Sequence, residues 1–256
     1  MTDRRPVVAG NWKMHLTVPA ALGLARAIRE GLPAAPAAEV ILFPPATALW
    51  PLHHLLADEM RMALGAQTVH WAAEGAHTGE IAVTMLADCC THVLVGHSER
   101  RRDAGETDVV VRRKLEAVLA GGLHPMVAVG ETLAERESGR MAEVVRRQTA
   151  AAFAGLPPAA VERCTIAYEP VWAIGTGQVA TIEDASAAIR SIRDALASAA
   201  GPEANSVRIL YGGSVTPENA TPLFAAPGID GGLVGGASLD PAAFLAIVAA
   251  AGRAPG

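Results

Sequence analysis

Polar side chains of four kinds follow short apolar runs in this sequence, at the points where buried strands would end. Asn11 comes directly after the first apolar run, and Lys13 follows two residues later. His97 follows the fourth run, and Glu169 follows the sixth. A positioned carboxylate can remove a proton beside a carbonyl, while an imidazole, an amide and an ammonium can stabilise the oxyanion that develops. These residue types predict proton-transfer chemistry on a small substrate.

Glycine-bearing turns follow the last two apolar runs. Gly212, Gly213 and Ser214 come after the seventh run, and Gly235 and Gly236 come after the eighth. Backbone N–H groups that no side chain covers can cradle an anion, most effectively where a helix begins. We therefore expect a substrate that carries a phosphate.

The elements that must position these residues alternate regularly along the chain. Apolar runs, mostly aliphatic at consecutive positions, predict strands buried on both faces, as in a parallel sheet. The expected strands are residues 7–10, 40–43, 63–67, 92–95, 125–129, 165–168, 207–211 and 232–234. Amphipathic stretches between them predict helices, one of which begins with a capping box at Thr181 to Asp184. The α/β fold class follows, as a single (β/α)8 barrel domain over residues 1–256, with a doubly wound open sheet as the alternative.

Composition excludes several classes of protein. Of 256 residues, 51% are hydrophobic and 18% are charged, which excludes an intrinsically disordered chain. A net charge of −5 and only 4% aromatic residues argue against a nucleic-acid partner. The apolar run of residues 242–251 is too short to span a bilayer, so we expect no membrane partner. The first residues contain no secretory signal pattern, so a cytoplasmic location is expected.

Two further motifs need an interpretation. Cys89, Cys90 and Cys164 have no metal-type spacing, so they are expected to be packing residues, and no metal site is predicted. Residues 175–180 match a G-x-G-x-x-A dinucleotide fingerprint, which would suggest a dehydrogenase. The match lies apart from the preceding strand and before the next helix cap, so a glycine-hinged loop carrying Trp172 that closes over a ligand fits better.

Five segments together resemble the triosephosphate isomerases, in order and over nearly the whole chain. They are residues 9–14, 95–101, 167–177, 211–215 and 233–239. The resemblance implies an aldose–ketose isomerase of glycolysis and gluconeogenesis. Such an enzyme interconverts dihydroxyacetone phosphate and D-glyceraldehyde 3-phosphate through an enediolate, without cofactor or metal.

The resemblance also implies roles for the polar residues. Glu169 would be the base that moves the proton between C1 and C2. His97, as a neutral imidazole, and Asn11 would donate hydrogen bonds to the enediolate oxygens, while Lys13 supplies positive charge. The place of His97 just before a helix start should disfavour the imidazolium, because the N-terminal end of a helix carries partial positive charge.

Further residues are assigned to substrate binding by the same resemblance. The backbone N–H groups expected to bind the phosphate are those of Gly175, Ser214, Gly235 and Gly236. Ile174 and Leu233 would pack near the base, and the loop of residues 172–176 would close and exclude water.

The long loop of residues 67–79 resembles one that reaches into a partner subunit, so a homodimer is expected. Gln67 begins this loop, and Thr78 near its end would approach Lys13 and Glu99 across the interface. His15 and His77 depart from the residues frequent in the family at these positions, which points to altered subunit contacts.

Two other functions remain open at this point. A paralogue acting on a four-carbon ketose phosphate would use the same catalytic residues with a differently shaped pocket. A catalytically retired barrel kept as a binding scaffold is the alternative from another class, and it would normally have lost at least one of Asn11, Lys13, His97 and Glu169.

Overall fold

The barrel of this protein is closed by parallel pairing between its first and last strands. The computed structural model describes residues 4–174 and 180–252. Eight parallel strands follow one another around the barrel in chain order, and Val7 of β1 pairs with Gly231 of β8. The predicted (β/α)8 fold is therefore confirmed, and the open doubly wound sheet is excluded.

The strands agree with the sequence-based ranges to within one residue at each end. They are β1 Val7–Asn11, β2 Glu39–Phe43, β3 Met62–Ala66, β4 His92–Val95, β5 His124–Val129, β6 Thr165–Tyr168, β7 Arg208–Tyr211 and β8 Gly231–Val234. The agreement has a simple cause, since strands covered on both faces read as continuous apolar runs.

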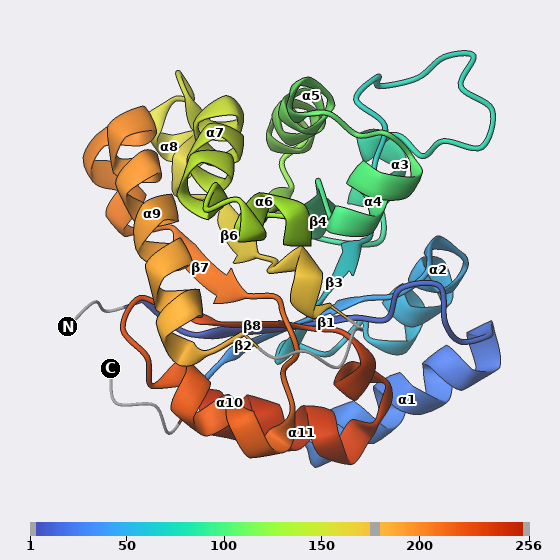
Figure 1. Ribbon diagram of the computed structural model, residues 1–256. Coiled ribbons are helices and arrows are strands. Elements are labelled where there is room, and N and C mark those ends of the chain that lie inside the picture. The colour runs from blue at the N-terminus through green and yellow to red at the C-terminus, as the bar shows by residue number, and fades with distance from the viewer. Residues whose placement is uncertain (1–3, 175–179, 253–256) are drawn as a thin grey trace.

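Helices surround the strands on the outside (Figure 1). They are α1 Val18–Gly31, α2 Ala46–Leu55, α3 Val83–Ala87, α4 Ser98–Asp103, α5 Asp108–Ala120, α6 Leu133–Glu137, α7 Met141–Phe153, α8 Pro158–Val161, α9 Ile182–Ala200, α10 Pro217–Phe224 and α11 Pro241–Ala251. Short 3-10 turns are η1 Val171–Ala173, η2 Gly201–Asn205 and η3 Gly236–Leu239.

The start of α9 shows how local sequence sets a helix boundary. Thr181 Oγ1 accepts a hydrogen bond from Asp184 N at 3.1 Å, and Asp184 Oδ2 accepts one from Thr181 N at 3.4 Å. Each side chain thus satisfies a backbone donor that the first helical turn leaves unpaired. The predicted capping box is confirmed, and the apolar face that follows it, from Ala185 through Ile192, is buried.

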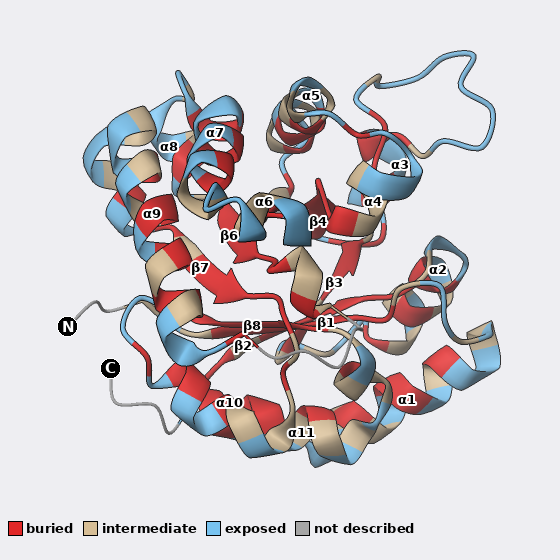
Figure 2. Ribbon diagram, in the orientation of Figure 1, coloured by how far each residue is buried: buried red, intermediate tan, exposed pale blue. Residues whose placement is uncertain are grey.

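The core has two layers, one inside the barrel and one between the strands and the helices. Successive residues of β1 alternate between them, since Val7 and Ala9 point inward while Val8 packs beneath the helices. The strands are buried almost throughout (Figure 2). Because apolar side chains fill the barrel interior, a binding site has room only at the ends of the strands.

Two other expectations can be compared with the structure. All three cysteines are buried thiols, and burial raises the pKa of the Cys90 and Cys164 thiols to about 12. Within residues 4–174 and 180–252, no helix combines the length and the apolar character that crossing a membrane would require.

Candidate active site

A cavity of about 410 Å³ opens at the carboxyl ends of the strands. The segments that follow β1, β4, β6, β7 and β8 form its walls, so residues far apart in the chain meet there. The predicted site residues that line this cavity are Asn11, Lys13, His97, Glu169, Ile174, Ser214, Leu233, Gly235 and Gly236. Gly175 lies outside the described residues.

The remaining predicted residues lie around this cavity or away from it. Gln67 and Glu99 form hydrogen bonds with Lys13 but do not line the cavity. Thr78 is exposed in the loop after β3 and does not line it either. That loop projects from the body of the barrel between β3 and α3 (Figure 2).

Lys13 is held in an uncommon backbone conformation. Its φ is +51°, a region that side-chain-bearing residues rarely adopt. Asn11 Oδ1 accepts a hydrogen bond from Lys13 N at 3.0 Å, and Gln67 Nε2 donates one to Lys13 O at 2.8 Å. The Lys13 ammonium donates to Glu99 Oε1 at 2.8 Å. Strain retained by several specific contacts is typical of functional sites.

The end of the aliphatic side chain of Lys13, next to its ammonium group, lies beside the glycine turn after β8. A Cβ added to Gly235 would lie 3.6 Å from Lys13 Cε, and one added to Gly236 would meet no atom within 4 Å. Ser238 anchors the turn, since its backbone N–H and its hydroxyl both donate to Gly235 O, at 2.8 and 2.6 Å. A cation next to uncovered backbone is well suited to bind a phosphate.

Glu169 is buried at the wall of the cavity, with only 2% of its surface exposed. Its Oε2 accepts a hydrogen bond from Ser98 N at 2.8 Å, and its Oε1 lies 3.0 Å from His97 Nε2. Burial by itself raises the pKa of this carboxyl, but the His97 imidazole and the Ser98 N–H outweigh it and lower the pKa below its usual value. The carboxylate is therefore ionised at neutral pH.

The His97 ring is oriented by the first turn of α4. His97 is the N-cap of that helix, and its Nδ1 accepts a hydrogen bond from Glu99 N at 3.2 Å. An Nδ1 that accepts carries no proton, so the neutral ring bears its proton on Nε2, which faces Glu169.

The expected lowering of the His97 pKa is not what this arrangement produces. Burial lowers the pKa of the imidazole, but the carboxylates of Glu169 and Glu99 raise it by more than burial lowers it. The net effect is a raised pKa. The reason is that Glu169 rests against the ring, and a nearby opposite charge favours the imidazolium more strongly than the helix end disfavours it.

Sequence reasoning missed the role of Glu131, which is fully buried just after β5. Its Oε1 accepts hydrogen bonds from Trp172 Nε1 at 2.9 Å and from Tyr168 Oη at 3.1 Å. Its backbone oxygen accepts one from Val171 N at 3.1 Å. Glu131 therefore anchors the start of the segment that follows Glu169. A polar residue two positions after an expected strand was the available signal.

A closed parallel barrel that brings a buried carboxylate, an imidazole and a lysine to one cavity at its carboxyl end defines a (β/α)8 barrel enzyme. The triosephosphate isomerase family model matches residues 6–251. The chain belongs to the triosephosphate isomerase family and is an isomerase.

Individual relatives agree with this assignment. The triosephosphate isomerase of Carboxydothermus hydrogenoformans is 48% identical, with 96% of this chain and 98% of the relative covered. That of Thermus thermophilus is 45% identical, with 97% and 100% covered. A crystal structure of triosephosphate isomerase from Bartonella henselae is similar with a TM-score of 0.85 and 40% identity, covering 95% of this chain and 97% of that one.

Proposed function

We propose that this enzyme interconverts dihydroxyacetone phosphate and D-glyceraldehyde 3-phosphate by proton transfer, with Glu169 as the base and without metal or cofactor. The observation that carries the proposal is the buried Glu169 carboxylate in the wall of the 410 Å³ cavity, which Lys13 and His97 also line. A cavity of this size is within the usual range for small-molecule sites.

The phosphate of the substrate binds at the turns after β7 and β8. Backbone N–H groups of Ser214, Gly235 and Gly236 surround it, and Lys13 contributes positive charge. The net charge of the chain is −5, so attraction of an anionic substrate depends on these local groups.

Glu169 turns from Ser98 toward the substrate and takes a proton from C1 of dihydroxyacetone phosphate. Leaving Ser98 removes one interaction that lowers the pKa of the carboxyl, while burial continues to raise it. The carboxylate is therefore a stronger base at the substrate than beside Ser98. The hydroxyl proton moves from O1 to O2 through His97, whose Nε2–H gives a proton to O2 and whose Nε2 then takes the proton from O1. The same carboxyl returns the first proton to C2, so the second product forms with no net gain or loss of protons.

The negative charge that develops on the substrate oxygens is stabilised by donors on neighbouring loops. His97 Nε2–H and the Asn11 amide donate hydrogen bonds, and the Lys13 ammonium supplies charge. When Glu169 turns away, the main interaction that raises the pKa of His97 is lost, so the ring acts as a neutral donor.

Substitution of the base tests the mechanism. We expect Glu169→Gln to lower kcat by about 10³-fold or more, because a correctly placed proton acceptor is lost, while binding of substrate is retained. A coupled assay with glyceraldehyde 3-phosphate measures turnover. Glu137→Gln, at the exposed end of α6, is the matched control and should keep full activity. Nearly unchanged turnover of Glu169→Gln would show that another residue is the base.

The four-carbon alternative is tested with the same assay. A four-carbon ketose phosphate should be turned over far more slowly than the triose phosphate. Activity on the four-carbon compound alone would contradict the proposed substrate, and no turnover on any small sugar phosphate would favour a binding scaffold.

We also propose a homodimer in which the loop of residues 67–79 enters a second copy of the chain. Met14, next to Lys13, is 96% exposed, which is unusual for a large apolar side chain. A further cavity of about 270 Å³, lined by Lys13, Met14 and Glu99 among others, lies beside the active site. Thr78 of a second copy would fill it.

Sedimentation measures the assembly directly. We expect a dimer, and we expect Thr78→Arg to shift it toward monomer and lower kcat, because the bulky cation would meet Lys13 of the other copy. A fully active monomer would contradict this arrangement.

A further inference from the structure

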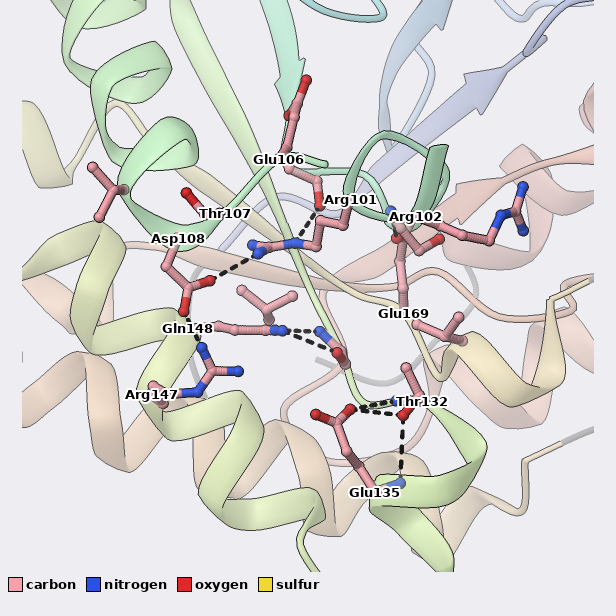
Figure 3. A pocket seen from close by; sticks show the side chains of 16 residues that line it. Arg101, Arg102, Glu106, Thr107, Asp108, Thr132, Glu135, Arg147, Gln148 and Glu169 are labelled. Carbon is pink, nitrogen blue, oxygen red and sulfur yellow. Dashed lines mark hydrogen bonds and ion pairs between the residues drawn. The ribbon is translucent and has the colours of Figure 1, made fainter. Parts of the chain in front are cut away.

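A second and larger cavity lies on the other side of Glu169. Its volume is about 640 Å³, and it is bounded by the segments after β4 and β5 and by α5, α6 and α7 (Figure 3). Glu169 lines both this cavity and the active-site cavity, while Gly130 lines only this one. Open space on this side means that close packing alone does not hold the backbone next to Glu169 in place.

One buried side chain, Gln148 of α7, holds that backbone. It is 7% exposed, its Oε1 accepts a hydrogen bond from Gly130 N at 2.7 Å, and its Nε2 donates one to Gly130 O at 3.2 Å. Figure 3 shows both bonds reaching from the helix across the cavity wall. Both backbone polar groups of Gly130 are therefore satisfied by a single amide.

Gly130 in turn abuts the backbone of Glu169. A Cβ added to Gly130 would lie 1.7 Å from Glu169 O, a distance that only glycine tolerates. The residue before Gly130 also contacts this backbone, since Glu169 N donates a hydrogen bond to Val129 O at 2.8 Å. Residues 129 and 130 thus lie directly against the Glu169 backbone, so a shift of Gly130 would be transmitted to Glu169.

We infer that Gln148 is a positioning residue for the isomerisation, which sets the place of the Glu169 carboxylate through its two hydrogen bonds to Gly130. This inference rests on the proposed role of Glu169 as the base. Without Gln148, the backbone of Gly130 can move toward the cavity and Glu169 can follow. The phosphate-binding turns lie on other strands, so proton transfer is impaired while substrate binding is not.

The first test is Gln148→Met, which keeps the length of the side chain and removes both hydrogen bonds. We expect kcat to fall roughly 10- to 100-fold, since a small displacement of a reacting group costs this much, with KM within about twofold of the parent enzyme. Thr149→Val is the matched control on the same helix. It removes a buried hydrogen bond, from Thr149 Oγ1 to Val145 O at 2.7 Å, that does not reach the site. It should lower stability but leave kcat unchanged.

The second test is Gln148→Glu, whose activity should be partly restored at low pH. A merely structural role of Gln148 does not predict such a recovery. A protonated carboxyl can accept from Gly130 N and donate to Gly130 O, as the amide does, whereas a carboxylate cannot donate. We expect the ratio of variant to parent kcat to rise as the pH is lowered. This pH profile decides the question even if Gln148→Met does not fold.

Several results would overturn the inference: a kcat of Gln148→Met within about twofold of the parent, an equal kcat loss in Thr149→Val, or a Gln148→Glu ratio that does not change with pH. These outcomes differ from a failure of the proposed function. If Glu169→Gln remains active, the base is wrongly assigned. If Glu169→Gln is inactive and Gln148→Met is fully active, only the positioning role is wrong.

Discussion

Each end of the barrel holds a glutamate against a histidine, yet the two pairs have different surroundings. At the carboxyl end, Glu169 Oε1 lies 3.0 Å from His97 Nε2. At the amino end, Glu39 Oε1 of β2 lies 3.4 Å from His92 Nε2 of β4, and the guanidinium of Arg208 also pairs with Glu39. Residue types alone do not distinguish these two pairs.

The two pairs differ in two respects: an arginine guanidinium contacts Glu39, and an open cavity lies beside Glu169. Contact with His92 and with the Arg208 guanidinium holds the pKa of Glu39 at about 2. Among the described residues, the only ion pair of Glu169 is with His97, because the Lys13 ammonium is engaged by Glu99. A permanent cation keeps a carboxylate in its anionic form. A titratable ring and a neighbouring cavity are compatible with the movement and proton uptake that we propose for Glu169.

The largest effect should come from removing each carboxylate in turn. Glu169→Gln should lower kcat by about 10³-fold or more, whereas Glu39→Gln should keep kcat within about twofold. The reason is that Glu169 lines the candidate active-site cavity, whereas Glu39 does not. Steady-state kinetics on both variants makes the comparison, and a Glu39→Gln enzyme as inactive as Glu169→Gln would remove the distinction.

The histidines provide the next contrast. We expect His97→Asn to lower kcat by roughly 10²- to 10³-fold, through loss of a donor to the developing oxyanion. His92→Asn should leave kcat nearly unchanged, because His92 faces Glu39 at the amino end. If both variants lose activity equally, the His97 ring has no special role in catalysis.

Two glycines allow the same comparison for the backbone. A Cβ would lie 1.7 Å from Glu169 O at Gly130, and 1.9 Å from Val7 O at Gly231, which begins β8. Both Gly→Ala substitutions should lower the free energy of unfolding by about 1–3 kcal/mol, because a backbone must shift. Only Gly130→Ala should also lower kcat, by about tenfold or more, since the shift displaces Glu169. Urea unfolding and kinetics on the two variants separate these effects.

The smallest effect concerns pH and stability at the amino end. The pKa of Glu39 is about 2 in the folded chain against an ordinary 4.5, so its ion pair contributes stability above pH 4.5 and loses it as the pH falls toward 2. At neutral pH, Glu39→Gln should lower the free energy of unfolding by about 2 kcal/mol. This difference should shrink as acid is added, as followed by urea unfolding at several pH values. A difference independent of pH would show that the ionised form is not what stabilises this end.

The strands and the position of most site residues were predictable, because both depend on short stretches of sequence. A strand buried on both faces shows as an apolar run, and catalytic groups of such barrels follow the strands directly. Asn11, His97 and Glu169 were recognisable in this way. Their roles in the reaction remain proposals that the experiments above test.

Gln148 could not have been recognised, because its importance depends on a contact between α7 and the segment after β5. In the sequence it is one polar residue within a helix, where the ordinary expectation is a solvent-facing side chain. Lys114 is a similar case, since it lies on the inner face of α5 and pairs with the buried Glu106 at 2.6 Å. Helix periodicity predicts which face of a helix is buried, but it does not predict which residue of another element will pair with a polar group on that face.

The sequence by itself determined the alternation of strands and helices, the helix caps and the turns that carry the polar groups, because each of these arises within a few consecutive residues. Only the tertiary structure decided that β1 meets β8, that Glu169 rests between Ser98 and His97, and that the His97 pKa is raised rather than lowered. These properties depend on distances between loops far apart in the chain. Such distances are set by the closure of the barrel and by the cavities that its packing leaves.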